Sequence, residues 1–343
     1  MKILIDSSIP FVEGVFEPYV DVVYADGAKI SREDVSDADA MVIRTRTVCD
    51  KELLEGSAVK LIATVTAGTN NIDKEYCRSR GISVKNAAGA NSDGVLQYVF
   101  SALYGVAARK TIKLDDATIG IVGVGETGRK IEDAARKLGF SVLLYDPLRA
   151  KEVGPEKFCS LEYLARNSQV ITLHIPVNAS TANLADEAFF SHVNPGTIFI
   201  NAADGALVDE DALIDASIKL GAVIIDTWRN EPFVNKRLMD IADIATPHIA
   251  GYSLWSKRKG STLAVRTVAE FFGIQELKLF DTVLDEELPG PLKLDLEGLS
   301  QGERASVLQY NYPVFTADFM FSMAPASFES LRAGYRYRRE III

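Results

Sequence analysis

The chain has 343 residues, 48% of them hydrophobic and 24% charged, which is enough for two domains with large apolar cores. Its net charge of −10 argues against a nucleic-acid partner, because neutralising phosphates requires a basic face. No apolar run is long enough to span a membrane and the first residues lack a secretory signal, so we expect a cytoplasmic protein without membrane contact. Three widely spaced cysteines make neither a disulfide framework nor a zinc site, and we expect no metal.

Short apolar runs separated by polar, turn-rich segments occupy roughly the first 90 residues. The strand-like runs lie at residues 1–6, 20–25, 40–45, 60–65 and 82–86, and helix-like runs lie at 50–56 and 73–81. Strands that alternate with helices are typical of a parallel sheet with crossover helices. This part of the chain is therefore predicted to form a small doubly wound α/β unit.

A long helix is predicted over residues 91–110, since Asn91 or Ser92 can cap it and apolar residues recur every three or four positions. It is apolar on more than one face, so we expect it to be buried between domains. A second series of strands follows at 117–125, 141–146, 170–176, 197–202, 222–228 and 242–250. Helices fit between these strands, for example over 210–221 with Gly221 as its C-cap.

The end of the chain departs from this alternation. A helix over 253–273 is predicted to cross back to the first domain, and from about residue 274 the pattern weakens. We predict a substrate-binding domain of residues 1–92 with 252–285, and a dinucleotide-binding domain of residues 93–251. Residues 286–343 are predicted to form a small appended module with a role in association.

A glycine-rich loop follows the first strand of the second series. It reads Gly123-Val124-Gly125-Glu126-Thr127-Gly128 and opens a predicted helix over 126–138. The first glycine permits a tight turn, the second lets the backbone approach a pyrophosphate, and the third lets helix and strand pack closely. The N–H groups at the helix N-terminus then face the phosphate charge. The loop predicts a dinucleotide site.

The next strand ends in Asp146, where an acidic residue is expected to bind the ribose hydroxyls. A carboxylate at this position repels a 2′-phosphate, so NAD is favoured over NADP. Arg149 lies nearby and leaves NADP as an alternative.

Three histidines are candidates for moving a proton near neutral pH. His192 lies in a polar stretch and is expected to be solvated, whereas His174 and His248 follow strands at the carboxyl edge of the predicted sheet. Glu231 follows the preceding strand and favours His248, because a carboxylate beside an imidazole orients it and stabilises its protonated form. Asp226 ends that strand and is expected to face the nicotinamide, with a turn or helix cap as the alternative.

The segments GVGETGRK, LHIP, INAADGALVDEDAL, DTWRNEP and TPHIAGYS resemble, in this order, the D-isomer-specific 2-hydroxyacid dehydrogenases. The resemblance covers about residues 1–275. It implies a Rossmann-type NAD-binding domain, a flavodoxin-like substrate-binding domain and a C-terminal α+β dimerisation module. MKILID, TAGTNNID, HIAGYS and the ending SFESLRAGYRYRRE are similar to the branch that oxidises 4-phospho-D-erythronate in pyridoxal phosphate biosynthesis.

The resemblance also implies roles for individual residues. His248 would be the acid/base supported by Glu231, and further cofactor positions are Asp146, Ile175, Asp226 and Gly251. Substrate positions are Thr45, Thr66 and Tyr252, with backbone N–H groups of Ala67, Gly68 and Thr69 offered to the substrate carboxylate. Arg44 and Arg46 suit phosphate or carboxylate by their chemistry, although surface ion pairs are an equal alternative.

One position breaks the family pattern. The catalytic arginine that grips the substrate carboxylate should lie in the loop after the strand at 197–202, and this sequence has Asp204 there. Losing one partner of a buried charge pair costs about 2–5 kcal/mol, and the lower end is already more than tenfold in rate. The chain could be an NAD-binding relative with impaired catalysis, or Arg229, Arg44 or Lys257-Arg258 could replace the arginine. Two alternatives remain. Residue 204 has been altered, deliberately or by a sequencing error, or the substrate is another small D-2-hydroxy acid.

Overall fold

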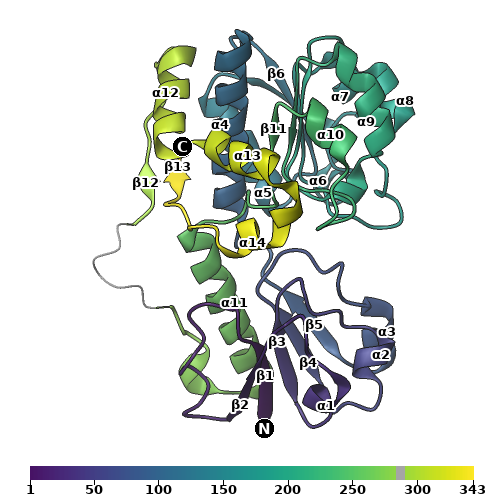
Figure 1. The fold of residues 1–343 in the computed structure, drawn as a ribbon, viewed down its shortest axis with the longest axis vertical. Coiled ribbons are helices and arrows are strands. Elements are labelled where there is room, and N and C mark those ends of the chain that lie inside the picture. The colour runs from purple at the N-terminus through teal and green to yellow at the C-terminus, as the bar shows by residue number, and fades with distance from the viewer. Residues whose placement is uncertain (283–289) are drawn as a thin grey trace. The chain divides into compact units, whose positions relative to one another are not determined.

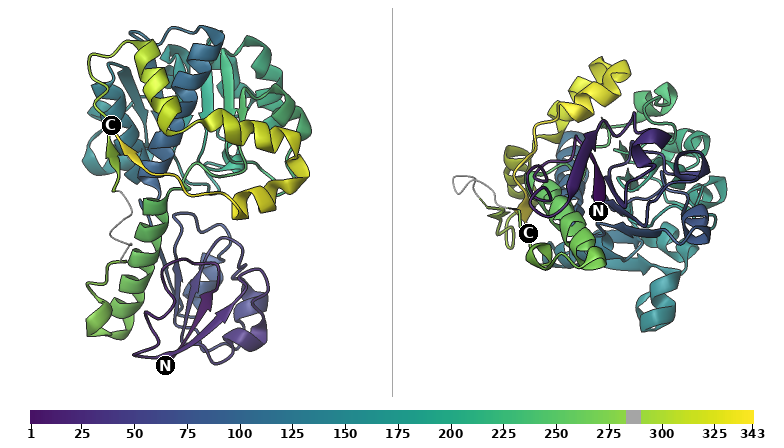
Figure 2. Two further views of the ribbon diagram at one scale, coloured as in Figure 1. Left: turned by 60° about the vertical axis from the view of Figure 1, so that its left-hand side comes forward. Right: turned by 90° about the horizontal axis from the view of Figure 1, so that it is seen from below.

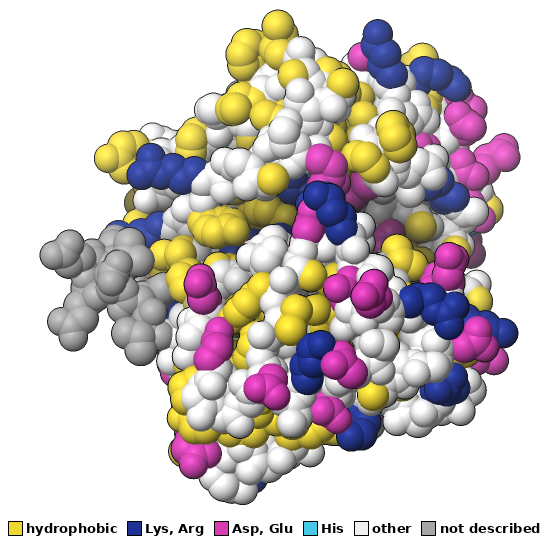
Figure 3. Space-filling model, turned by 60° about the horizontal axis from the view of Figure 1, so that its bottom comes forward, with side chains coloured by type: hydrophobic (Ala, Val, Ile, Leu, Met, Phe, Trp, Pro, Cys, Tyr) yellow, Lys and Arg dark blue, Asp and Glu magenta, His cyan; other side chains and the backbone are white. Residues whose placement is uncertain are grey.

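The computed structural model describes residues 1–282 and 290–343, in two compact units. The first consists of Met1–Asn91 with Ser253–Gly290, and the second of Ser92–Tyr252 with Pro291–Ile343. The predicted boundary between residues 285 and 286 lies outside the described residues. Within the described residues, no helix is both long and apolar enough to cross a membrane. On the face shown in Figure 3, acidic and basic side chains are interspersed.

The first unit is built on a five-stranded parallel sheet in the order β2-β1-β3-β4-β5, which is the flavodoxin-like order predicted (Figure 1). Its strands are β1 (Lys2–Asp6), β2 (Asp21–Ala25), β3 (Ala40–Ile43), β4 (Leu61–Thr64) and β5 (Ser83–Asn86). Side chains alternate between the two faces, as a strand requires. Ile3 and Ile5 pack with the helix α11 (Leu254–Phe272), and Leu4 packs in the core of the opposite face.

Short helices cover that opposite face: α1 (Arg32–Val35), α2 (Lys51–Leu54) and α3 (Lys74–Ser79). After residue 252 the chain returns through α11, which belongs to this unit. The Ser253 side chain caps its N-terminus, and Gly273 ends it in the left-handed conformation at φ 77°.

The second unit is built on a six-stranded parallel sheet in the order β11-β10-β9-β8-β6-β7. The strands are β6 (Thr118–Val122), β7 (Ser141–Tyr145), β8 (Val170–Leu173), β9 (Ile198–Asn201), β10 (Ala222–Ile225) and β11 (Ile244–Ala245). The chain order reverses between β6 and β8, so the switch point of the sheet lies at their carboxyl ends. Ligands of doubly wound folds bind at this edge.

Helices cover both faces of this sheet (Figure 2). One face carries α4 (Ser92–Lys110) and α5 (Glu126–Lys137), and the other carries α7 (Leu161–Asn167), α8 (Glu187–His192) and α9 (Glu210–Ala216), with α10 (Lys236–Ile241) beyond α9. α6 (Pro147–Val153) follows β7. The burial predicted for α4 is confirmed, and its neighbours in this unit are α5, α12 and α13.

The C-terminal residues contribute α12 (Gln301–Asn311), α13 (Val314–Met323) and α14 (Phe328–Ala333), which follow one another over the second unit (Figures 1 and 2). A parallel pair of short strands, β12 (Leu292–Lys293) and β13 (Ile341–Ile342), completes them. α12 lies beside α4, and α13 packs against β11 and α4. These residues belong to the same compact unit as the six-stranded sheet.

The predicted C-cap at Gly221 is wrong. α9 ends at Ala216 with Ser217 as its C-cap, and a 3-10 turn over Ser217–Lys219 follows. Gly221 stands at the entry of β10, where a Cβ would overlap the carbonyl oxygen of Gly196. The glycine therefore permits close approach of two backbones.

Candidate active site

The glycine loop joins β6 to α5 at the switch point. A Cβ on Gly123 would overlap the backbone of His174 and Ile175, and one on Gly128 would overlap the carbonyl oxygen of Gly123. A Cβ on Gly125 would meet nothing within 4 Å. Two glycines therefore allow the backbone packing, whereas the space over Gly125 stays open for a pyrophosphate at the N-terminus of α5.

Asp146 follows β7, beside this loop. Its Oδ2 accepts the N–H of Val124 at 2.8 Å, and its Oδ1 accepts the N–H of Arg149 at 3.0 Å as the N-cap of α6. Each carboxylate oxygen has a further lone pair that can accept a ribose hydroxyl. The open backbone at Gly125 and the fixed acceptor at Asp146 together fit NAD.

The remaining predicted cofactor residues surround this loop. Glu126 is exposed and pairs with Arg129 one turn later, and Thr127 places its Oγ1 3.0 Å from Ser92 Oγ. Ile175 is buried just after β8, and Gly251 follows the His248 loop. Cofactor contacts of these residues stay predictions.

Two of the three histidines make local contacts. His174 has its Nε2 2.9 Å from Thr172 Oγ1, and burial lowers the pKa of His174 to about 3. Its imidazole is therefore neutral near pH 7 and is a poor proton acceptor. His192 ends α8, with its Nδ1 3.2 Å from a guanidinium nitrogen of Arg166.

His248 and Glu231 are brought together as predicted. Nδ1 of His248 lies 2.8 and 3.0 Å from the two carboxylate oxygens of Glu231, and Oε1 also accepts the N–H of Trp228 at 3.0 Å. Burial raises the pKa of Glu231, but the charge and hydrogen bond of His248, the Trp228 N–H and the charge of Arg332 outweigh it, and the pKa lies below 4.5. Glu231 is thus an anion that fixes Nδ1, which leaves Nε2 of His248 to exchange a proton.

Asp226 holds the loop that carries His248 through hydrogen bonds. The Asp226 carboxylate accepts the N–H groups of Ile249 and Ala250, both at 2.8 Å, and the Thr246 hydroxyl at 2.6 Å. Its carbonyl accepts the His248 N–H at 2.8 Å. This buried side chain, whose pKa burial raises, therefore organises the loop, and its predicted contact with the nicotinamide stays a prediction.

Arg338 holds the same loop through its carbonyl groups. Its Nη1 donates to the carbonyls of Ile249 at 3.0 Å and Tyr252 at 3.1 Å, and its Nη2 donates to Ala250 and, at 2.8 Å, to Gly94. The guanidinium is buried over the Tyr312 ring, 4.1 Å from the centroid. Arg338 was not predicted as a site residue, and its only signal in the sequence was the arginine-rich end of the chain.

These contacts support an unusual backbone at His248. Its φ is 54°, in the left-handed region that residues other than glycine rarely adopt. Such a conformation persists where the surroundings over-determine it, and it is concentrated at functional sites. Asp226 supplies that support by binding N–H groups of the loop, and Arg338 by binding its carbonyl groups.

Asp204 lies in the turn after β9. Its Oδ1 accepts the Ala206 N–H at 2.9 Å, and its carbonyl accepts from the Asn201 amide at 2.9 Å. A Cβ on Gly205 would overlap the backbone of Trp228, so this turn packs against the segment that leads to Glu231. The turn that carries the Asp204 carboxylate therefore lies beside the segment from Trp228 to Glu231. The family pattern has an arginine at position 204.

Two cations that could replace that arginine are engaged elsewhere in their own units. Arg229 donates to the Val208 carbonyl at 2.7 Å and to the Asn183 side chain. Arg258 pairs with Asp281 at 2.8 Å and stacks on Trp255.

The predicted substrate residues of the first unit lie after β3 and β4. Thr66 Oγ1 lies 2.7 Å from Thr64 Oγ1 and donates to the Gly68 carbonyl at 3.1 Å, while the Asn86 amide holds the Ala67 carbonyl at 2.6 Å. The Asn71 amide joins this loop to the Arg44–Thr47 loop, donating to the carbonyls of both end residues.

The side chains of the Arg44–Thr47 loop differ in their contacts. Arg44 donates to the hydroxyl of Ser8 at 3.2 Å, Thr45 is half-buried, and Arg46 is exposed. Thr45, Thr66 and both arginines thus gather at one edge of this sheet. Their substrate contacts stay predictions.

A doubly wound unit with this glycine loop, Asp146 and an imidazole–carboxylate pair defines an NAD-dependent dehydrogenase. Residues 102–250 match the model of the NAD-binding domain of the D-isomer specific 2-hydroxyacid dehydrogenases. The chain is 39% identical to the erythronate-4-phosphate dehydrogenase of Bacteroides fragilis, over 99% of this chain and 97% of that one. It is 36% identical to the protein of the same name in Escherichia coli, over 99% and 92%. The chain belongs to the D-isomer specific 2-hydroxyacid dehydrogenase family, and its cofactor is NAD.

Solved structures agree with the fold. The NAD-bound 3-phosphoglycerate dehydrogenase of Entamoeba histolytica is 26% identical with a TM-score of 0.68, covering 84% of this chain and 99% of that one. The D-lactate dehydrogenase of Aquifex aeolicus, solved with NAD and lactic acid, is 24% identical with a TM-score of 0.69, covering 84% and 100%. The predicted family, fold class and cofactor are confirmed.

Proposed function

We propose that this protein oxidises 4-phospho-D-erythronate at C2, giving 3-hydroxy-2-oxo-4-phosphooxybutanoate in pyridoxal phosphate biosynthesis. The observation that carries the proposal is the match, over nearly the whole chain, to the erythronate-4-phosphate dehydrogenases. The ordered His248–Glu231 pair supports it, because oxidation of an alcohol requires a proton acceptor beside the hydroxyl.

The residues of this chain have distinct roles in the proposed reaction. Nε2 of His248 takes the proton of the C2 hydroxyl, and Glu231 stabilises the imidazolium that results. NAD, when bound, would supply the acceptor for the hydride from C2. Tyr252 contacts the substrate. Its anionic ends are bound by Thr45, Thr66, the N–H groups of Ala67 and Gly68, and the cations Arg44 and Arg46.

A second candidate function is NAD binding without efficient turnover, and Asp204 is the observation that favours it. A carboxylate at this position repels the substrate carboxylate and cannot polarise the C2 oxygen. The ordered dyad favours retained activity. Oxidation of a different small D-2-hydroxy acid is a third candidate, since the TAGT loop does not itself demand a phosphate.

A substrate comparison tests these alternatives. NADH formation is measured with 4-phospho-D-erythronate, D-erythronate, D-lactate and 3-phospho-D-glycerate. We expect kcat/KM for 4-phospho-D-erythronate to exceed the others by at least about tenfold, a difference of about 1.4 kcal/mol in transition-state binding. A higher kcat/KM for another acid overturns the substrate assignment. No turnover with any acid, while NADH still binds, favours the second candidate.

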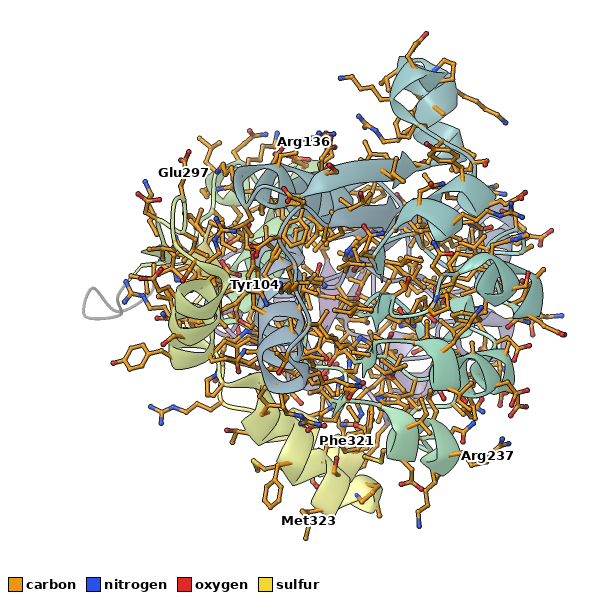
Figure 4. The ribbon with its side chains drawn as sticks, turned by 90° about the horizontal axis from the view of Figure 1, so that it is seen from above. Tyr104, Arg136, Arg237, Glu297, Phe321 and Met323 are labelled. Carbon is orange, nitrogen blue, oxygen red and sulfur yellow. The ribbon has the colours of Figure 1, made fainter. Side chains whose placement is uncertain are left out.

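The proposal includes a homodimer formed through the C-terminal residues. Large apolar side chains of α12 and α13 are exposed, with Tyr310 at 88% and Met323 at 71%. In Figure 4, Met323 points outward from α13, whereas Phe321 lies on its inner side. A second copy would cover the outer side, since exposed apolar groups gathered on one surface mark interaction sites. Light scattering is expected to give twice the mass of the chain, and Met323→Glu to give the monomer; a monomeric unchanged chain contradicts this part.

A further inference from the structure

The last turn of α14 and the residues after it lie against Tyr252. The Tyr252 ring has the rings of Tyr335 and Tyr337 beside it, with centroids 6.1 and 6.2 Å away. The guanidinium of Arg332 lies over the same ring, 5.6 Å from its centroid. Tyr252 is a predicted substrate residue that follows the His248 loop, so the C-terminal segment supplies part of the surroundings of the dyad.

The polar groups of Arg332 are incompletely satisfied. Nε of Arg332 is buried and has no hydrogen-bond partner among residues 1–282 and 290–343. Within the same residues its guanidinium makes no ion pair, and its only ring contact is with Tyr252. A guanidinium carries five N–H donors, and a buried donor without an acceptor costs about 1–3 kcal/mol. Such a guanidinium can accommodate an anionic ligand, which would offset this cost.

Arg332 also interacts electrostatically with the dyad. Its charge is one of the causes that hold the pKa of Glu231 below 4.5, although no direct ion pair forms within the described residues. The charge of Arg332 therefore acts on Glu231, while no ion pair within the described residues occupies its guanidinium. The backbone of this segment is fixed by Arg338, whose hydrogen bonds reach the carbonyls of Ile249 and Tyr252.

The charge balance around the dyad explains why a cation is required there. Asp204 and Glu231 bring two carboxylates to this part of the second unit, and Arg229 is occupied by Val208 and Asn183. A substrate with a carboxylate and a phosphate adds further negative charge. A further cation here would offset these negative charges.

We propose that Arg332 binds an oxyanion of the substrate, either its C1 carboxylate or its phosphate, next to the His248–Glu231 dyad. It takes over the anchoring function that the arginine at position 204 has in the family pattern. Guanidinium forks bind carboxylates and phosphates through paired N–H donors, so either oxyanion suits it. The inference rests on the proposed function, because it deepens the description of the same site.

The test compares Arg332→Gln with Arg336→Gln, a matched variant of an exposed arginine in the same segment. In Arg332→Gln, we expect kcat/KM for 4-phospho-D-erythronate to fall at least about tenfold through KM, and Arg336→Gln to stay within about twofold. A loss confined to 4-phospho-D-erythronate assigns the phosphate, and an equal loss with D-erythronate assigns the carboxylate. An unchanged KM for both substrates overturns the proposal.

A binding measurement separates this proposal from the proposed function. Inorganic phosphate and 4-phospho-D-erythronate are titrated into the NADH-loaded protein by calorimetry. The unchanged chain could bind 4-phospho-D-erythronate without turnover, and Arg332→Gln could weaken this binding at least about tenfold. That result supports the anion site and contradicts the proposed dehydrogenase activity. Equal affinities in the two proteins, or no binding to either, overturn the anion site even if turnover is found.

Arg332→Lys guards against a purely structural effect. It keeps the charge but loses the paired donors, so its KM should lie between those of the unchanged chain and Arg332→Gln. Thermal unfolding of all variants is measured in parallel. If the two Arg332 variants lose only apparent kcat, in proportion to a lost folded fraction, and keep an unchanged KM, the anchoring role is contradicted.

Discussion

The carboxylate of Glu231 lies 2.8 Å from Nδ1 of His248, and the N–H of Trp228 points at the same carboxylate. This relationship fixes the tautomer of the imidazole, because Nδ1 must carry the proton that Glu231 accepts. Nε2 is then the nitrogen that can take a proton from an alcohol. The ordered pair separates His248 from His174, whose burial keeps it neutral.

The depressed pKa of Glu231 predicts how stability depends on pH. Burial opposes ionisation, but His248 and the other partners outweigh it, so the folded protein holds the Glu231 proton less tightly than the unfolded chain does. This contribution to stability is present above pH 4.5 and is lost as the pH falls through the lower folded-state pKa. We expect the difference in unfolding free energy between the unchanged chain and Glu231→Gln to shrink below pH 4.5, as measured by urea denaturation. A difference that grows on acidification contradicts this assignment.

Arg338→Met is expected to disorder the His248 loop. The substitution removes the donors of the Ile249, Ala250 and Tyr252 carbonyls, and charged hydrogen bonds contribute about 1.5–3 kcal/mol each. Unfolding free energy should therefore fall by about 3 kcal/mol or more. The chain has three histidines, so the His248 imidazole signal can be assigned by NMR and should broaden or split.

Arg336→Met is the control for this change, because Arg336 is exposed in the same segment. Its unfolding free energy should stay within about 0.5 kcal/mol of the unchanged chain. A sharp, unshifted His248 signal in Arg338→Met would show that Asp226 alone fixes the loop.

The glycine loop offers a matched pair of substitutions. Gly125→Ala places its methyl group in open space, so stability should change by no more than about 0.5 kcal/mol while NADH binding weakens at least about tenfold. Gly128→Ala forces a methyl group onto the Gly123 carbonyl and should destabilise the fold itself. Thermal unfolding and NADH fluorescence titration separate the two effects. Normal NADH affinity in a folded Gly125→Ala protein would contradict the assignment of this loop to the cofactor site.

Asp204→Arg restores the residue of the family pattern. It removes a carboxylate and adds a guanidinium beside the dyad, so we expect kcat/KM for 4-phospho-D-erythronate to rise at least about tenfold. In the Arg332→Gln background the gain should be larger, because the restored arginine would then be the main anchor. Initial rates with the four proteins test this coupling. An additive result would mean that positions 204 and 332 act independently.

The fold could be predicted well because its information is local. Alternating apolar runs predicted β1 to β5 and β6 to β10 within a few residues, and the glycines predicted the switch-point loop. Gly221 was misassigned because its reason is a contact with Gly196, which helix-end composition does not encode.

The surroundings of the site were less predictable for the same reason. Arg338 reaches the carbonyls of the His248 loop, and Arg332 reaches the Tyr252 ring, from far later in the chain. The resemblance of the ending SFESLRAGYRYRRE did not indicate either contact. The position of Asp226 just after β10 did not predict the three donors around its carboxylate, and its contact with the nicotinamide stays a prediction. The left-handed backbone of His248 likewise depends on these distant partners.

The most direct test of the account is NADH formation from 4-phospho-D-erythronate by the unchanged chain and by His248→Asn. The account predicts measurable turnover by the unchanged chain and a loss of at least about 100-fold in His248→Asn, with NADH affinity preserved, because the imidazole takes the hydroxyl proton. Turnover that survives in His248→Asn, or no turnover by an unchanged chain that binds NADH normally, would contradict it.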